Sequence, residues 1–544
     1  MGETFLVSQI RLLRYLDLSF VNLSKAVDWQ QAINKLPLLT ELQLVSCQLP
    51  QTTIPPSFDL LPTNSSSSMS LSVGGLSRNN LISGIVPDLS SRLVDTPEID
   101  LSSNCFNNPI PSLPPNVTLV NLSKNMFSGS ISSLCDYPIG LFGYLDLSNN
   151  SLSGELPDCW MNNELLSILN LANNYFSGKL PSSIGGLRNL QTLHLANNKF
   201  VGELPLSLQE CTQMIVLDLG ENKFAGEIPA WIGTHLTNLI VLSLRLNEFY
   251  RSIPPNICHL EHIQILDFSQ NNISGTIPRC FNNFTLLQRN TSSGTIEFVG
   301  LLDYALSGSF RVGGNYTDYA LVQWKGQEWE YKKNLGQLKN IDLSSNKLVW
   351  RIPKNIVSFK GLLYLNLSRN HLTGTIIQRI GEMEMLECLD LSKNQLSGEI
   401  PTDFARLHFL SVLDLSDNNL SGKIPSSTQL QSFNASSCAG NPDLCGLPLP
   451  KCQGDETAAR VPAVTDHGID NNFEENQDKL VTFGFYVSMV LGFILSFWAV
   501  LGTLLLKRSW QHAYFQFLNA IKDWIYVTTA VYAARLQRKL TSYM

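Results

Sequence analysis

A recurring acidic residue is the first feature of this 544-residue chain that could do chemistry. It stands between two apolar residues of a short L-D-L segment that returns about every 24 residues. A row of carboxylates on one face could bind a basic ligand. A carboxylate in a repeated segment also keeps an open strand soluble, and this second interpretation is the simpler one. The acidic positions are Asp17, Asp100, Asp146, Asp218, Asp267, Asp342, Asp390 and Asp414.

The cysteines are the second set of reactive residues, and all 11 precede residue 453. Two pairs occupy near-equivalent places in successive repeats, and successive coils of a stack lie roughly 5 Å apart, within disulfide reach. Free buried thiols are the alternative for both pairs. In the stretch CAGNPDLCGLPLPKC a third bridge would leave Cys438 unpaired or as an alternative partner. The expected bridges are Cys135–Cys159, Cys258–Cys280 and Cys445–Cys452.

Neither a metal site nor an enzyme is expected. The segment CHLEH at residues 258–262 has metal-binding residue types, but it lacks the H-E-x-x-H spacing and its Leu260 belongs to the leucine pattern. The chain also lacks a G-x-G-x-x-G loop and a nucleophile elbow. A formal net charge of -7 gives no reason to expect nucleic acid. We predict no cofactor.

The elements that must position these residues come from one repeated pattern, L-x-L-x-x-N. The alternating leucines indicate a short strand with one buried face, and the asparagine can satisfy buried backbone groups in the turn that follows. One repeat cannot bury its own apolar face, but a stack can. The sixth position of the pattern falls at Val21, Cys47, Asn79, Asn104, Asn125, Asn150, Asn174, Asn198, Asn222, Asn247, Asn271, Asn346, Asn370, Asn394 and Asn418.

The pattern resembles the plant-type leucine-rich repeat, whose L-x-G-x-I-P marker appears at Gly154–Pro157 and Gly226–Pro229. The expected fold is an α/β leucine-rich-repeat solenoid, plant-type and β-rich, with a parallel sheet on its concave face, plus one transmembrane helix. The expected order is about 11 repeats in 1–284, an island insertion in 285–334, four repeats in 335–427, a C-terminal cap in 428–452, an acidic juxtamembrane linker in 453–479, a transmembrane helix in 480–506 and a short basic cytoplasmic tail in 507–544.

Residues 480–506 contain no charge, and about 20 apolar residues suffice to span a bilayer as a helix. Acids dominate before this run and bases after it, so the positive-inside rule places the N-terminus outside a plasma membrane, as in a type I protein. Small residues four apart would let a partner helix approach closely, although small residues are also common in membrane helices. They are Gly484, Ser488, Gly492 and Ser496.

Twelve Asn-X-Ser/Thr sequons support an exported glycoprotein, since all precede residue 480, although some would arise by chance in an Asn- and Ser-rich repeat. The opening residues contain no adequate signal peptide, so we expect a truncated chain or a mispredicted start. The sequons are at Asn22, Asn64, Asn116, Asn121, Asn149, Asn272, Asn283, Asn290, Asn315, Asn366, Asn419 and Asn434.

The tail segment YFQF, from Tyr514 to Phe517, fits the Tyr-x-x-apolar form of an endocytic sorting signal. It fits equally well in an interfacial amphipathic helix anchored by Trp510 and Trp524.

The order of these parts resembles plant receptor-like proteins, and most of all the ethylene-inducing xylanase receptor type of disease-resistance protein. The stretches YLDLSFVNLSKAVDW, CFNNFT, WQHAYFQFLNAIKDW and the cap GNPDLCGLPLPKC carry this likeness. In the insertion, Tyr316 precedes Lys325 and Gly326 by a spacing seen in islands of this family, which implies a role in ligand binding. The usual Cys-bearing N-terminal cap is missing.

The resemblance implies a kinase-less cell-surface receptor of plant defence. It would recognise an extracellular ligand, a microbial protein, peptide or glycan, through the repeats. It would signal through membrane-bound receptor-like kinases, contacted by the ectodomain and the membrane helix. The alternatives are a developmental peptide co-receptor and a repeat-type inhibitor of microbial wall-degrading enzymes.

Two repeats near the insertion break the pattern. Arg251 and Trp350 stand where most repeats have glycine, in NEFYRSIP and NKLVWRIP. One hypothesis is that the insertion folds over this lateral face, contacts Trp350 and forms part of the ligand-binding surface. Random drift at an exposed site is the rival explanation.

Overall fold

A computed structural model gives the fold. It describes residues 15–29, 41–50, 53–54, 79, 82–84, 86, 89, 98–115, 117–136, 143–163, 165–289, 319–324, 327–331, 335–426 and 428–452.

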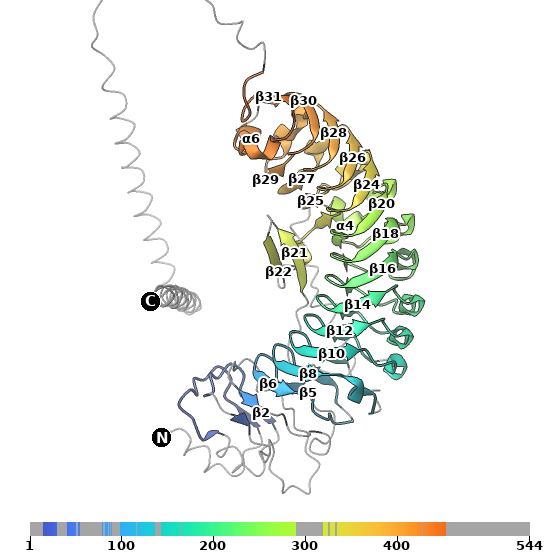
Figure 1. Cartoon of the computed structure of the whole chain (residues 1–544). Helices are drawn as coiled ribbons and strands as arrows, with labels where there is room; N and C mark the ends of the chain where they lie inside the picture. Colours follow the sequence, from blue (N-terminus) through green and yellow to red (C-terminus); the bar gives the residue numbers. More distant parts are fainter. Residues whose placement is uncertain are drawn as a thin grey trace, which may run out of the picture. The chain divides into compact units, whose positions relative to one another are not determined.

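The L-x-L segments form a parallel sheet of 12 strands along the concave side of a curved solenoid (Figure 1). In each strand the central residue points into the core, and the residues on either side of it face the concave surface. The strands, in chain order, are β5 (Glu98–Asp100), β7 (Leu119–Asn121), β9 (Tyr144–Asp146), β11 (Ile168–Asn170), β13 (Thr192–His194), β15 (Val216–Asp218), β17 (Val241–Ser243), β19 (Ile265–Asp267), β23 (Asn340–Asp342), β25 (Tyr364–Asn366), β27 (Cys388–Asp390) and β29 (Val412–Asp414).

The residues after each asparagine form a second parallel sheet, of 15 strands, on a lateral face of the solenoid. Its strands are β3 (Thr53–Ile54), β4 (Ser83–Gly84), β6 (Cys105–Asn108), β8 (Met126–Gly129), β10 (Ser151–Glu155), β12 (Tyr175–Gly178), β14 (Lys199–Gly202), β16 (Lys223–Glu227), β18 (Glu248–Ser252), β20 (Asn272–Gly275), β24 (Lys347–Trp350), β26 (His371–Gly374), β28 (Gln395–Gly398), β30 (Asn419–Lys423) and β31 (Asp443–Cys445).

Two further sheets have two strands each. The parallel pair β1 (Tyr15–Asp17) and β2 (Glu41–Gln43) lies at the N-terminal end, and β21 (Ala320–Trp324) pairs antiparallel with β22 (Gln327–Tyr331) as a hairpin inside the insertion.

Short helices return the chain along the convex side, mostly after the proline that ends each lateral strand. They are η1 (Ser132–Asp136), η2 (Trp160–Asn162), η3 (Ser182–Gly186), η4 (Leu206–Glu210), α3 (Trp231–His235), η5 (Pro255–His259), η6 (Arg279–Asn283), α4 (Thr285–Gln288), η7 (Leu335–Gln337), η8 (Lys354–Ser358), η9 (Ile380–Glu382), η10 (Thr402–Arg406), α6 (Thr428–Gln431) and η11 (Ala435–Cys438).

A ladder of asparagine side chains joins each coil to the one before it. Asn222 is typical: its Nδ2 donates to the Leu195 carbonyl of the preceding coil at 2.9 Å and also to Leu219 and Gly220 of its own coil. Its Oδ1 accepts the Phe200 N–H at 3.1 Å. One buried side chain thus satisfies four backbone groups that would otherwise lack partners.

The core behind the ladder is built from leucines and a row of phenylalanines. Phe176, Phe200 and Phe224 are fully buried, and successive ring centroids lie 6.3 and 5.8 Å apart. Their backbone N–H groups are the ones that the asparagines bind. The ladder and the aromatic stack therefore fix the same residues.

The solenoid continues without a break across the insertion. Strand β19 pairs directly with β23, and β20 pairs with β24. Asn346 donates to the Phe268 carbonyl at 2.9 Å and accepts from the Ile273 N–H at 3.0 Å, as if the two coils were consecutive in the sequence.

The end of the solenoid contains more repeat structure than the sequence pattern predicts. Asn441, within the expected cap, donates to the Leu415 carbonyl and accepts from the Leu420 N–H. Strand β31 then pairs with β30. The residues from 428 to 452 thus cover the last coil partly by adding another rung to it.

We expect Asn222→Ala to destabilise its coil by about 1–3 kcal/mol, because the Phe200 N–H and the Leu195 carbonyl lose a buried partner. Hydrogen exchange should show faster exchange of the Phe200 amide. Lys223→Ala, at the exposed next residue, is the matched control and should leave this amide unchanged. Equal protection in both variants would contradict the role of the ladder.

Candidate ligand-binding surface

An apolar platform on the concave face is the base of this surface. Five consecutive coils, from Ile168 to Ile265, carry a β-branched residue immediately before their central leucine, and two of them carry a second one just before it, at Ile215 and Ile240. Because both strand neighbours of a core leucine face the concave side, these residues are exposed unless something covers them. The platform consists of Ile215, Val216, Ile240, Val241 and Ile265.

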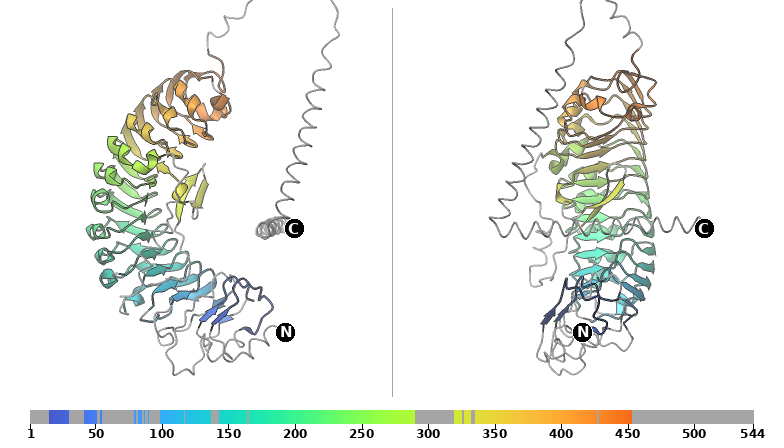
Figure 2. Two further views of the ribbon diagram at one scale, coloured as in Figure 1. Left: turned by 180° about the vertical axis from the view of Figure 1, so that it is seen from behind. Right: turned by 90° about the vertical axis from the view of Figure 1, so that its left-hand side faces the viewer.

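The insertion returns to this platform and covers it. Ala320 and Val322 of β21, with Leu335 and Leu338 around η7, form one buried cluster with the platform residues, and Tyr331 of β22 packs against it. Figure 1 and the rotated views of Figure 2 place the hairpin on the concave side of the middle coils. The hairpin is thus held by apolar burial.

Tyr319 extends the contact toward the N-terminal coils. Its ring stacks on the His194 imidazole, with centroids 4.5 Å apart and planes within 5°. Its hydroxyl accepts a hydrogen bond of 3.4 Å from Asn170 Nδ2. His194 is fully buried, and its Nδ1 lies 3.5 Å from Asp218 Oδ2. The insertion therefore contacts strands from β11 to β19.

The recurring aspartates of the concave strands, which we call the acidic stripe, each stabilise a turn within their own repeat. In each case the carboxylate Oδ1 accepts the N–H two residues later, as Asp390 does from Ser392 and Asp414 from Ser416, at 2.9 Å. The asparagines Asn170 and Asn366 do the same at their equivalent positions. This turn accounts for the recurrence of Asp without a ligand.

Burial nevertheless divides the stripe into a covered centre and accessible ends. Asp100 and Asn121 at one end, and Asn366, Asp390 and Asp414 at the other, are half-buried. The positions between them are buried, and this stretch centres on the strands that the insertion contacts. They are Asp146, Asn170, His194, Asp218, Ser243, Asp267 and Asp342.

Two buried carboxylates lie side by side where the insertion leaves and rejoins the sheet. Asp267 and Asp342 are directly paired across β19 and β23 and are only 2% and 1% exposed. Burial, and then the neighbouring Asp267, raise the pKa of Asp342 to about 7. Burial likewise raises the pKa of Asp267. Asn366 Nδ2 donates to Asp342 Oδ2 at 3.2 Å.

One basic residue lies beside the acidic stripe, two positions after the end of strand β17. Arg245 stands where neighbouring coils have a small residue, is buried, and forms an ion pair of 3.2 Å with Glu221. It also acts on Asp267 by lowering the pKa of that carboxyl, against the larger effect of burial. The covered centre thus contains both signs of charge.

The hypothesis that the insertion covers Trp350 is wrong for the part of the insertion that the structure describes. That part packs on the concave sheet, because the apolar platform lies there, whereas Trp350 ends a lateral strand and is 68% exposed. Arg251, also lateral and exposed, forms an ion pair with Glu227. Tyr316, Lys325 and Gly326 lie outside the described residues.

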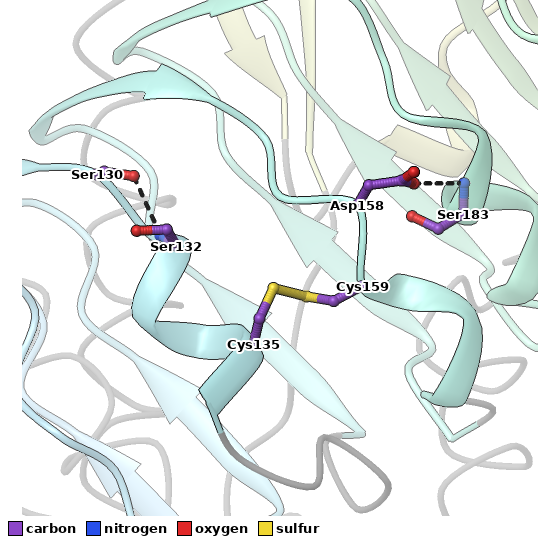
Figure 3. The surroundings of a disulfide bond; sticks show 6 residues. All are labelled: Ser130, Ser132, Cys135, Asp158, Cys159 and Ser183. Atoms are coloured by element: carbon purple, nitrogen blue, oxygen red, sulfur yellow. Dashed lines mark hydrogen bonds between the residues drawn. A yellow bond between two sulfur atoms is a disulfide. The ribbon is translucent and has the colours of Figure 1, made fainter.

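The three cysteine pairs named from the sequence are joined in the structure as Cys135–Cys159, Cys258–Cys280 and Cys445–Cys452. Cys438 is a buried free thiol. Figure 3 shows Asp158, next to Cys159, accepting the Ser183 N–H of the following coil at 3.0 Å. Hydrogen bonding from Ser183 lowers the pKa of the Asp158 carboxyl. Covalent and polar links thus connect three successive coils.

The sequons differ in what their asparagines already bind. Asn366 Nδ2 donates to both Asp342 Oδ2 and the Tyr364 hydroxyl, so a glycan on this nitrogen would break both bonds. Asn121 is half-buried on the concave face, and Asn64, Asn116, Asn290 and Asn315 lie outside the described residues. The exposed sequon asparagines are Asn22, Asn149, Asn272, Asn283, Asn419 and Asn434.

Within the described ranges, no group of three or more His, Cys, Asp or Glu side chains could hold a metal ion. Cys258 of the CHLEH segment is in a disulfide, and Leu260 is buried in the core.

No helix among the described residues is long and apolar enough to cross a bilayer. The run 480–506 lies outside them, with its small residues Gly484, Ser488, Gly492 and Ser496, and so does the segment from Tyr514 to Phe517.

Sequence reasoning missed the platform and His194, although both left a signal. Paired β-branched residues at 215–216 and 240–241, where other coils carry at most one such residue, indicate a covered surface. A histidine in place of Asp or Asn at 194 marks the coil where an aromatic ring stacks.

We expect Val241→Thr to weaken docking of the hairpin by about 1–3 kcal/mol, because it buries a hydroxyl in an apolar cluster. Hydrogen exchange in β21 and β22 should accelerate roughly tenfold or more. Val412→Thr changes the same strand position in a coil outside the platform and should leave the hairpin unaffected. Equal exchange in the two variants would show that the platform does not hold the hairpin.

The Asp342 carboxyl should make stability depend on pH. Its folded pKa of about 7 exceeds its unfolded value, so the folded state binds the extra proton and stability falls as pH rises from about 4 to 7. The slope is at most about 1.4 kcal/mol per pH unit for one proton. Asp342→Asn should flatten this slope in unfolding measurements, whereas Asp414→Asn, at the half-buried end, should keep it. A slope unchanged by Asp342→Asn would refute the assignment.

Comparison with known proteins agrees with the repeat architecture. The Leucine Rich Repeat family model matches residues 143–163, 165–187, 189–211, 262–284, 361–383, 385–407 and 409–430.

Two curated relatives come from tomato, Solanum lycopersicum. Receptor-like protein EIX2 is 51% identical over 551 residues, which cover 96% of this chain and 53% of the relative. Receptor-like protein EIX1 is 57% identical over 264 residues, which cover 48% of this chain and 25% of that relative. The chain thus spans about half the length of the first relative and a quarter of the second.

Among solved structures, the Arabidopsis receptor kinase HAESA in complex with the peptide hormone IDA and the co-receptor SERK1 has a TM-score of 0.58 and 26% identity, covering 78% of this chain and 64% of that one. Shared repeats, continuous similarity over nearly the whole chain and the common solenoid lead to one conclusion: the chain belongs to the plant leucine-rich-repeat receptor-like proteins.

Proposed function

We propose that the protein is a kinase-less cell-surface receptor of plant defence that recognises an extracellular microbial ligand and signals through partner receptor kinases. The observation that carries the proposal is the insertion docked on the concave sheet. It creates a composite surface of hairpin and strand residues, flanked by accessible acidic positions at Asp390 and Asp414. Such a surface, on a rigid stack, is suited to binding.

The similarity to the EIX receptor-like proteins supports a receptor of this type. The HAESA ectodomain, in complex with a peptide hormone and a co-receptor, supports the idea that a solenoid of this fold can bind a ligand and a second receptor together. In this proposal the apolar run 480–506 anchors the receptor at the plasma membrane, and its small residues contact the membrane helix of the kinase.

A developmental peptide co-receptor is a second candidate, favoured by the peptide hormone bound in the HAESA complex. A repeat-type inhibitor of wall-degrading enzymes is a third. The three candidate functions predict different outcomes when a microbial protein is added to the cell. A defence receptor starts a defence response, and a developmental co-receptor gives no response. An inhibitor blocks the activity of the microbial protein without a cell response.

The test is to express the full chain behind a signal peptide in leaf cells that lack a response of their own, and to add an ethylene-inducing xylanase as the probe. We expect an oxidative burst and co-precipitation of receptor kinases, both lost in a variant whose residues 285–334 are replaced by a short Gly-Ser linker. The direct pairing of β19 with β23 lets the solenoid continue without the insertion.

The linker variant also carries polar substitutions at Val216 and Val241, so that the uncovered platform stays soluble. A matched control carries the same two substitutions with the insertion intact. A cell response that persists without the insertion would contradict the proposed role of this surface. Inhibition of the xylanase without any cell response would favour the inhibitor.

A further inference from the structure

The lateral sheet carries an aromatic residue under backbone strain. Trp350 ends β24 with a φ of 70°, where Gly275 and Gly374 of the adjacent strands have φ of 75° and 80°. A bulky side chain in this left-handed region costs about 1–3 kcal/mol. The indole nevertheless stays 68% exposed, so burial in the solenoid does not offset the strain.

Among the described lateral strands, the other non-glycine residues at this position are Asn108, with a φ of 89°, and the larger Arg251, with a φ of 63°. Arg251 has a side-chain partner. Its guanidinium lies 2.9 Å from Glu227 of the preceding coil. Trp350 has no such contact with any residue that the structure describes. Strain at an exposed aromatic side chain is a feature that is concentrated at functional sites.

Three basic side chains and one histidine lie on the coil of Trp350 and on the strand next to it. Lys347, Arg351 and Lys354 belong to the same coil, and His371 starts the adjacent strand β26, where it pairs with Val349. All four are exposed, and none forms an ion pair within the part of the chain that the structure describes. We call Lys347, Trp350, Arg351, Lys354 and His371 the lateral patch.

The side chain of Arg351 extends over the adjacent strand of the lateral sheet. The Arg351 side chain crosses β26 at Gly374, with its Cγ 2.7 Å from where a Cβ would stand. Lys347 and His371 are the first residues of adjacent strands, and His371 pairs with Val349, two residues along β24 from Lys347.

Acidic residues are absent from this region of the lateral sheet. Strands β20, β24 and β26, as described, contain none, and the nearest lie on β18 at Glu248 and after β28 at Glu399. The lateral patch is thus a local positive surface on a chain with a net charge of -7. Because the described lateral strands next to it contain no acidic residue, the positive charges of the patch are available to attract an anionic ligand.

We propose that the lateral patch binds an acidic polysaccharide made of uronate units. A flat exposed indole stacks on the C–H face of a sugar ring. The guanidinium of Arg351 matches a carboxylate with its planar donor fork, Lys347 offers a further charge, and the His371 ring on the adjacent strand offers a hydrogen-bond donor. A peptide of Asp and Glu residues would use the cations but has no ring face for the indole, so the saccharide fits the patch better.

This binding site is separate from the concave surface, and it goes beyond the proposed receptor function. The lateral sheet and the concave sheet are different layers of the solenoid. Asn272, an exposed sequon residue, lies on β20 two positions before Ser274, which pairs with Lys347. A glycan there would border the lateral patch at its lysine end, while Trp350 lies at the other end of β24.

The test immobilises the full chain and measures binding of three probes: a de-esterified oligogalacturonate, the same oligomer fully methyl-esterified, and a polyglutamate of equal charge. Each variant takes the residue found at the same position of a nearby coil, which protects the fold. Trp350→Gly takes the residue of Gly374, and the double variant Lys347→Gln with Arg351→Thr takes those of Gln395 and Thr375.

We expect the de-esterified oligomer to bind, with an affinity that falls as salt rises. Trp350→Gly and the double variant should each weaken binding at least tenfold, and Lys223→Gln, at the same strand position elsewhere, should not. Thermal melting of Trp350→Gly should occur at or above that of the parent, because the strain is removed.

Undiminished binding in Trp350→Gly, or equal binding of the methyl-esterified oligomer, would overturn the proposal. Polyglutamate binding as tightly as the oligogalacturonate would also overturn it, in favour of an acidic peptide. None of these outcomes depends on the response to a microbial protein, so the two proposals fail independently.

Discussion

The asparagine side chain that bridges consecutive coils is the interaction on which the rest of the structure depends. Each one satisfies backbone groups of two coils inside a dry core, where an unpaired group costs about 1–3 kcal/mol. Because Asn222 binds Leu195 and Phe200 of the coil before it, every coil is held in register with its neighbour. Both parallel sheets, and every column of side chains on their faces, inherit that register.

Because the register is fixed, equivalent positions of adjacent coils lie side by side, and residues that differ from the repeat there form continuous surfaces. Three coils with β-branched residues become one apolar platform, and one coil with a histidine becomes a stacking site for Tyr319. The same register places Asp267 directly opposite Asp342, although 74 residues of sequence, including the insertion, separate them. The insertion docks on the platform, and the carboxylates of the middle coils are buried around it. Docking and protonation are therefore connected through shared burial.

Departures from the repeat change the local chemistry of the stack at particular coils. Arg245 replaces a small residue and brings a cation into a buried acidic column. Trp350 replaces a glycine and keeps an indole in solvent at a cost in backbone strain. On a scaffold whose other positions repeat, such exceptions are the residues to test first for a role in binding.

Local pattern by itself determined the solenoid, the positions of the concave strands, the equivalent cysteine pairs and the place of the insertion, because leucine spacing and the asparagine position act between neighbouring coils. It did not predict the lateral sheet. The comparison with known proteins then confirmed the family that the motifs resemble. The sequence did not reveal where the insertion docks, because Tyr319 meets Asn170 and His194 more than a hundred residues away. It also could not assign a raised pKa to Asp342 among eight similar aspartates, since burial and the opposing Asp267 exist only after the chain has closed over them. Contacts between adjacent coils follow from the repeat pattern of the sequence. Contacts between a non-repeating segment and a distant face depend on surfaces that form only when the coils have stacked.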